Sequence, residues 1–211
     1  MEASLTASTE QPAAVVFDVG RVLIQWDLRA LFCKLIDDKE ELDWFLANVV
    51  TEEWHFQHDA GRPLDDMVPE RQARFPEYAD HIAAYRTRFL ETIPGPVPGS
   101  ADLVERLDAR GVPLFAITNF GAEFWDMFRP TAPVMDLFRD IVVSGREKLA
   151  KPGPEIFDLA ARRFAHAPQD MLFIDDNSDN IATAKTLGWH THIFRDAKAL
   201  AADLTERGLL G

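Results

Sequence analysis

Short apolar segments alternate with amphipathic segments in the second half of the chain. Four apolar segments predict β-strands: Val112–Thr118, Asp140–Ser144, Met171–Asp175 and His190–Phe194. Between them lie three segments with apolar residues at helical spacing, which predict helices: Ser100–Gly111, Lys151–Phe164 and Ser178–Gly188. The strand segments are continuously apolar, which is typical of strands buried on both faces. We therefore predict an α/β fold, a Rossmann-like parallel sheet with helices on both faces.

The segment from Leu28 to Pro94 has a different pattern. Its apolar residues recur at helical spacing, and no part of it has a strand pattern. It is closed by Ile93–Gly99, where three prolines and two glycines exclude a helix. We predict a helical cap domain at residues 28–94, inserted into a core domain made of residues 13–27 and 95–211. A cap over the carboxyl ends of the strands would act as a lid on a ligand site.

The charge of the chain limits its partners. Apolar residues make up 47% of the 211 residues, enough for a sizeable core, and 35 acidic against 22 basic residues give a net charge of −13. Such a charge repels nucleic acids and anionic membranes, so we expect neither as a partner. We expect a small-molecule ligand and a monomer or homodimer. An anionic ligand would need local positive charge, from a metal ion or a well-placed lysine.

Three features bear on localisation. Residues 1–12 are small and polar and lack the basic start and apolar core of a signal peptide, so we expect a flexible N-terminus there. No apolar run approaches the roughly 18 residues of a membrane span. The single cysteine, Cys33, lies in an apolar helical pattern, and we interpret it as a buried structural thiol. The low cysteine count fits a reducing compartment, and we predict a cytoplasmic protein.

Polar residues lie at the ends of three predicted strands. Asp18 follows the first apolar run of the chain, and Asp175 and Asp176 end a later one. Thr118 and Asn119 end another. Because the carboxyl ends of parallel strands meet at one edge, we expect these side chains to converge. Three carboxylates repel one another in a confined site, and a divalent cation with a preference for oxygen ligands removes that repulsion. This pattern predicts a Mg²⁺ site.

Four short motifs in this order resemble those of the haloacid dehalogenase superfamily, whose members are mostly Mg²⁺-dependent phosphatases. The motifs are "FDVGRVL", "ITNF", "KPGPEIF" and "FIDDNSDN", with their key residues at Asp18, Thr118, Lys151, Asp175, Asp176 and Asp179. The match spans residues 15–194 and includes an inserted helical cap. The resemblance implies a hydrolase that acts on phosphoric monoesters.

The resemblance also implies roles for the motif residues. Asp18 would attack phosphorus and form an aspartyl-phosphate, and Lys151 would neutralise charge between phosphate and Asp18. Asp18, Asp176 and the backbone carbonyl of Gly20 would bind Mg²⁺, and Asp175 would support the metal directly or through water.

Further residues lie in or beside the motifs. The resemblance makes Thr118 and the region of Asn119 ligands of the phosphoryl oxygens. Asp179 and Asn177 have two interpretations, a site role or a place at a helix N-terminus, and the sequence leaves both open.

Gly20 departs from the family pattern. Phosphatases of this family usually carry a second Asp there, which protonates the leaving oxygen and then activates water. A positioned general acid is typically worth about 10²–10⁴ in rate. A glycine is compatible with a substrate whose leaving group needs little protonation, such as a hexose 1-phosphate. A subgroup of bacterial phosphatases, the glucose-1-phosphate-phosphatase-like enzymes, has the same Asp-x-Gly start.

Gly20 is also compatible with two different classes of protein. In a metal-independent 2-haloacid dehalogenase, Asp18 would attack carbon and halide would leave without a proton. The paired carboxylates Asp175 and Asp176 argue against that branch, whose fourth motif lacks them. The second class is a catalytically weakened protein that binds a phosphorylated ligand.

The predicted cap carries candidate substrate residues. Trp54, His55 and His58 crowd together in "TEEWHFQHD", and they belong either to a packed helix or to a patch that faces the ligand. Trp54 and His58 share a helix face, from which His55 is offset.

Residues near the motifs complete the predicted site. Trp26, Phe120 and Trp125 follow motif residues closely enough to line the same mouth, while Arg21 has either a substrate or a turn role. Closure of the cap would exclude water, with hinges near Trp26–Leu28 and Pro94–Gly99.

Overall fold

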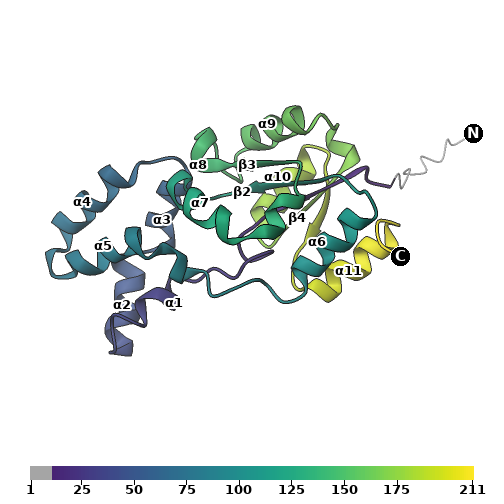
Figure 1. Cartoon of the computed structure of the whole chain (residues 1–211). Helices are drawn as coiled ribbons and strands as arrows, with labels where there is room; N and C mark the ends of the chain where they lie inside the picture. Colours follow the sequence, from purple (N-terminus) through teal and green to yellow (C-terminus); the bar gives the residue numbers. More distant parts are fainter. Residues whose placement is uncertain (1–10) are drawn as a thin grey trace, which may run out of the picture.

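The computed structural model describes residues 11–211, and its centre is a sheet of five parallel strands in the order β3-β2-β1-β4-β5 (Figure 1). The strands are β1 (Ala14–Phe17), β2 (Leu114–Thr118), β3 (Asp140–Val143), β4 (Met171–Asp175) and β5 (His190–Ile193). The first four coincide with apolar segments of the sequence, β5 lies in the predicted strand His190–Phe194, and the predicted α/β, Rossmann-like fold is confirmed.

The three central strands are buried along their whole length, whereas the edge strands β3 and β5 are partly exposed. Val16 of β1 pairs with Phe115 of β2 and with Phe173 of β4. A strand covered on both faces has no solvent side, which explains the continuous apolar runs. The same register brings the residues that follow these strands to one edge of the sheet.

Helices cover both faces of the sheet. They are α9 (Pro154–Phe164) and α10 (Ser178–Thr186) on one face, and α6 (Ser100–Ala109) and α11 (Ala197–Glu206) on the other. Val16 packs in one buried cluster with Phe157 of α9, and Val15 packs in the other with Leu107 of α6 and Leu204 of α11. Alternate residues of β1 therefore enter different cores, as the two-residue period of a strand requires.

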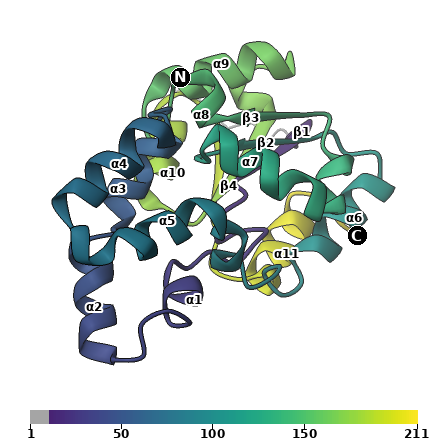
Figure 2. The ribbon, with the colours of Figure 1, turned by 60° about the vertical axis from the view of Figure 1, so that its left-hand side comes forward.

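Five helices form a lobe beside the carboxyl edge of the sheet, and we call them the cap helices (Figure 2). They are α1 (Arg29–Phe32), α2 (Lys39–Asn48), α3 (Glu52–Asp59), α4 (Leu64–Arg74) and α5 (Ala79–Thr87). Helix α3 begins where the Thr51 hydroxyl accepts a hydrogen bond from the Trp54 amide at 3.0 Å. This N-cap satisfies a backbone donor that the helix cannot pair itself.

Short helices complete the connections: η1 (Pro76–Tyr78), η2 (Phe89–Thr92), α7 (Ala122–Phe128), η3 (Arg129–Thr131), η4 (Pro133–Leu137), α8 (Ser144–Glu147) and η5 (Pro168–Asp170). The start of α8 binds the end of α3, because the Ser144 hydroxyl donates to the Asp59 carbonyl at 2.6 Å. Gly121, at the start of α7, lies so close to α3 that an added Cβ would be 2.0 Å from His58 Cδ2. The cap and the sheet edge are thus in tight contact.

The prediction for Cys33 was wrong, since its side chain is exposed. Helix α1 ends at Phe32, so Leu31 and Phe32 take its buried positions and Cys33 turns outward. Of the predicted flexible segment, residues 1–10 lie outside the described residues, while Gln11 donates to the Gly208 carbonyl at 3.0 Å. None of the helices within residues 11–211 is long and apolar enough to cross a membrane.

Candidate active site

Three carboxylates meet at the carboxyl edge of the sheet. Asp18 follows β1, Asp175 ends the neighbouring strand β4, and Asp176 follows it. One oxygen from each of the three lies within 4.8 Å of the others. The sequence predicted this convergence because these residues lie at the carboxyl ends of parallel strands, and the register of β1 with β4 produces it.

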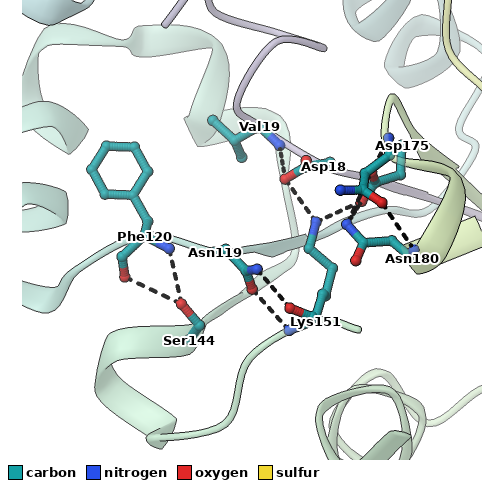
Figure 3. Close-up of polar contacts among 9 residues, drawn as sticks. Asp18, Val19, Asn119, Phe120, Ser144, Lys151, Asp175 and Asn180 are labelled. Carbon is teal, nitrogen blue, oxygen red and sulfur yellow. Dashed lines mark hydrogen bonds and ion pairs between the residues drawn. The ribbon is translucent and has the colours of Figure 1, made fainter. Parts of the chain in front are cut away.

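Lys151 lies between two of these carboxylates (Figure 3). Its Nζ is 2.9 Å from Asp18 Oδ1 and 2.7 Å from Asp175 Oδ2, and its side chain is 1% exposed. Asn119 fixes the backbone of Lys151 from the end of β2: its amide donates to the Lys151 carbonyl, and its oxygen accepts from the Lys151 N–H, both at 2.9 Å. The side chain of Asn119 is therefore occupied in positioning Lys151.

Asp175 is held by donors on both of its oxygens. Asn180 Nδ2 lies 3.1 Å from Oδ1 and 2.9 Å from Oδ2, and the Asn177 N–H donates to Oδ1 at 2.8 Å. With Lys151 as a further donor, the carboxylate is fixed in orientation. Asn180 escaped the sequence analysis, although it lies in the first turn of the helix that begins after the acidic pair.

The neighbours of Asn180 have other places. Asn177 caps α10, with its side-chain oxygen accepting from Asp179 N at 2.8 Å and from Asn180 N at 3.4 Å. Asp179 is exposed in the first turn of α10. Asn177 also lines the cavity described below, so it combines the two roles that the sequence left open.

Burial and crowding set the electrostatics of the site. Burial raises the pKa of Asp18 to about 7, and the nearby carboxylates add to the rise while Lys151 opposes it. Burial and Asp175 raise the pKa of Asp176. For Lys151, burial alone would lower the pKa, but Asp175 and Asp18 raise it above the ordinary value. The Lys151 ammonium is therefore charged. The carboxylates beside it would be stabilised further by additional positive charge.

These donors fit a hard divalent cation. Asp18 and Asp176 supply carboxylate oxygens close together, and Gly20 lines the same cavity. Asp175 accepts hydrogen bonds from Asn180 and Lys151, so it would support the metal ligands without binding the ion itself. Oxygen ligands of this kind suit Mg²⁺, which takes few carboxylates and keeps several waters.

A cavity of about 150 Å³ opens onto the carboxylates. The predicted residues that line it are Asp18, Gly20, Arg21, Trp26, His55, Asn119, Phe120, Lys151 and Asp176. Thr118 is fully buried behind this wall, and its hydroxyl has no hydrogen-bond partner among residues 11–211. An orphaned buried hydroxyl at a strand end is a donor available to a bound anion.

The cap contributes His55 and Asp59 to the same cavity. His55 Nε2 lies 3.2 Å from Asp59 Oδ2, and its Nδ1 lies 2.7 Å from the Tyr85 hydroxyl. The imidazole stacks on Trp26 with 4.6 Å between ring centroids. Asp59 escaped the sequence analysis, although its i, i+4 spacing from His55 was a usable signal.

Three other candidates lie away from the cavity. Trp54 is buried against Tyr85, with ring centroids 4.8 Å apart. His58 packs edge-on against Phe124, and Trp125 is buried beside Phe120. Trp54 and His58 share one face of α3, and that face packs into the protein; His55, offset from it, is the residue that reaches the site.

Comparison with known proteins identifies the family. A family model described as haloacid dehalogenase-like hydrolase matches residues 12–188. The chain belongs to the haloacid dehalogenase-like hydrolases. It is 33% identical over 135 residues to the phosphoglycolate phosphatase of Escherichia coli, a match that covers 60% of this chain and 50% of the relative. The chain thus spans about half the length of the curated relatives it matches.

Solved structures of haloacid dehalogenase-like proteins share the fold. A predicted hydrolase from Porphyromonas gingivalis superposes with a TM-score of 0.72 at 19% identity, covering 93% of this chain and 97% of the other. An enzyme from Bacteroides thetaiotaomicron, in complex with magnesium and inorganic phosphate, gives a TM-score of 0.64 at 23% identity over 87% and 94% of the two chains. At these identities the similarity establishes the common architecture.

Proposed function

We propose that this hydrolase is a Mg²⁺-dependent phosphatase that hydrolyses small phosphate monoesters through an aspartyl-phosphate on Asp18. The observation that carries the proposal is the buried Lys151 ammonium between Asp18 and Asp175, with Asp176 beside them. The arrangement pairs a nucleophilic carboxylate with a fixed cation and leaves oxygen ligands for a metal. The phosphatase named among the relatives and the magnesium and phosphate in the Bacteroides enzyme support it.

The geometry suits phosphoryl transfer. Asp18 is oriented by the Val19 N–H, which donates to its Oδ1 at 2.7 Å, so the other oxygen is the one available to attack phosphorus. Lys151 and the Thr118 hydroxyl are donors for the phosphoryl oxygens, and charge developing on those oxygens is stabilised by groups that are already in place. A bound Mg²⁺ would supply additional charge neutralisation for the phosphoryl group.

The carboxylate pair favours this reaction over dehalogenation. A halide displacement at carbon gains nothing from a cation site, whereas Asp175 and Asp176 are clustered and Asp175 is fixed by Asn180. A ligand-binding protein without catalysis would have no need of an oriented nucleophile beside Lys151. The experiment below distinguishes phosphatase activity from dehalogenation and from binding without catalysis.

We further propose hexose 1-phosphates among the substrates and residues 28–94 as the cap domain over a core of residues 13–27 and 95–211. The anomeric oxygen of such a sugar leaves more readily than an alkoxide, which suits Gly20. Trp26 lines the cavity beside His55, and its indole N–H has no hydrogen-bond partner within the described chain. His55 stacks on the indole and Arg21 lies over it, so the part of Trp26 that suits a sugar is the unpaired N–H, a donor for a hydroxyl.

The experiment measures phosphate release from p-nitrophenyl phosphate with Mg²⁺ and with EDTA, and halide release from 2-chloropropionate. We expect Mg²⁺-dependent phosphate release, abolished in Asp18→Asn and retained in Asp66→Asn, which changes an exposed carboxylate on α4. Metal-independent halide release would establish the dehalogenase instead. Binding of phosphate esters without turnover of p-nitrophenyl phosphate or of a sugar-phosphate panel would establish the binding protein.

A further inference from the structure

Asp59 is a buried carboxylate in the cavity, and the proposed function gives it no role so far. It is 5% exposed and lines the same cavity as Asp18 and Lys151. Its Oδ2 pairs with His55, but its Oδ1 is buried without a hydrogen-bond partner in the described part of the chain. A buried carboxylate oxygen is costly to leave unpaired. Asp59 lines the cavity, and the unpaired oxygen of its carboxylate is an acceptor for which the described residues provide no donor.

The surroundings of Asp59 fix its position. Its backbone carbonyl accepts from the Ser144 hydroxyl at 2.6 Å, which ties the end of α3 to the sheet edge. His55 is held in turn by the Tyr85 hydroxyl at 2.7 Å and by the face of Trp26. Asp59 therefore lies in a cap helix, and its contacts hold it at the carboxyl edge of the sheet.

The contacts of His55 use only one oxygen of Asp59. With a neutral imidazole, Nε2–H donates to Asp59 Oδ2 and the Tyr85 hydroxyl donates to Nδ1. These hydrogen bonds do not involve Oδ1, so they persist while Oδ1 gives up or takes back a proton. His55 therefore holds the carboxyl group in place.

We infer that Asp59 is the general acid and base of this enzyme, with His55 as its positioning partner, and that it replaces the side chain absent at Gly20. The inference rests on the proposed phosphatase function. Gly20 leaves open space, since an added Cβ there would meet no atom within 4 Å. The side of the site where the family's second aspartate normally stands is thus free, and Asp59 supplies a carboxyl group to the same cavity from helix α3.

The proton balance of the two steps is complete with groups that are present. In the first, Asp18 bonds to phosphorus and the bond to the leaving oxygen breaks; that oxygen keeps the electron pair and takes the proton from Asp59 Oδ1, while Oδ2 still accepts from His55 Nε2–H. In the second, water attacks the phosphoryl group, gives its proton to the Asp59 carboxylate, and displaces the Asp18 carboxylate. The sum is ester plus water to alcohol plus phosphate.

The test compares Asp59→Asn with wild type on p-nitrophenyl phosphate and on ethyl phosphate, in Mg²⁺. The quantity kcat/KM reports the first step, and ethyl phosphate carries a poor leaving group and no hydroxyl for the enzyme to bind. We expect kcat/KM to fall by about 10²-fold or more on ethyl phosphate and by far less on the aryl ester, since only a poor leaving group needs the acid. His55→Gln should shift the two substrates in the same direction by a smaller factor.

A double variant provides the second readout. Adding Gly20→Asp to Asp59→Asn should restore at least about tenfold of the lost turnover of ethyl phosphate, because it returns a carboxyl group to the other side of the leaving oxygen. Equal loss on both substrates, or no loss on ethyl phosphate, would overturn the role of Asp59. Loss confined to hydroxylated substrates such as glucose 1-phosphate would make Asp59 a specificity residue instead. Absence of aryl phosphate turnover in wild type is a separate result, which would refute the phosphatase function itself.

Discussion

The sheet edge and helix α3 of the cap both bring carboxylates to one cavity, but they position them in different ways. At the sheet edge, Asp18 and Asp175 follow paired strands, and the ladder itself sets their separation. On α3, Asp59 is placed by its spacing from His55 and by the contact of Ser144 with its carbonyl. The first arrangement is determined by the pairing of backbone strands, whereas the second depends on how the cap helices pack against the sheet edge.

This difference has a chemical consequence. The proposed nucleophile and metal ligands come from the parallel sheet, whereas the proposed acid, Asp59, comes from the cap helices. A catalytic site with groups from both the sheet edge and the cap helices is complete only when the cap helices pack against the sheet edge. Substitutions confined to the sheet edge or to the cap helices measure the contribution of each region to stability and turnover separately.

Lys151→Ala should have the largest effect at the sheet edge. It leaves buried Asp18 and Asp175 without their cation, and breaking such a pair typically costs about 3–5 kcal/mol. Denaturant unfolding in EDTA measures this loss. The free energy of unfolding should partly recover in Mg²⁺, since the metal replaces some of the missing charge; an identical loss in both conditions would contradict the metal site.

Asn180→Ala tests the support of the carboxylates without removing one. Asp175 loses its partner at 2.9 Å, and outer-shell changes of this kind typically lower metal affinity by about 10–100-fold. Titration of activity against Mg²⁺ measures the shift, with maximal activity at saturating Mg²⁺ affected less. The matched control is Asp179→Ala, at the exposed neighbouring position of α10. A comparable shift in that control would show that the effect does not come from Asp175.

Gly121→Ala disturbs the contact between the lobes. Its Cβ would meet His58 Cδ2 at 2.0 Å, so the cap must shift, at an expected cost of about 1–3 kcal/mol in unfolding free energy. Because α3 carries His55 and Asp59, turnover should fall as well. The double variant with His58→Ala relieves the clash and should recover both quantities. Additive losses in the double variant would show that the contact is unimportant.

Glu52→Gln should have the smallest effect. Glu52 of α3 pairs with Arg21 at 2.5 Å, but the two side chains are 64% and 45% exposed. Solvent screening limits such pairs to less than about 1 kcal/mol, and added salt should remove most of the difference from wild type. A loss of turnover as large as that of Gly121→Ala would mean that Arg21 acts on the substrate rather than on the cap.

The sequence predicted the elements that local patterns control. The strands appeared as apolar runs because they are buried on both faces, and the acidic residues at their ends indicated the site. The prediction that Cys33 is buried was wrong, because a helical pattern does not show where a helix ends. Helix α1 ends one residue before Cys33. Trp54 and His58 were distinguished from His55 only by what packs against each face of α3.

By itself, then, the sequence determined the parallel sheet and the convergence of Asp18, Asp175 and Asp176, since each lies at the carboxyl end of a strand, and its motifs indicated the family and, through it, Lys151. Only the tertiary structure decided that Asn119 and Asn180 hold these groups and that Asp59 joins them from the cap. Those contacts join residues far apart in the chain, and a helix face has no direction until another element packs against it.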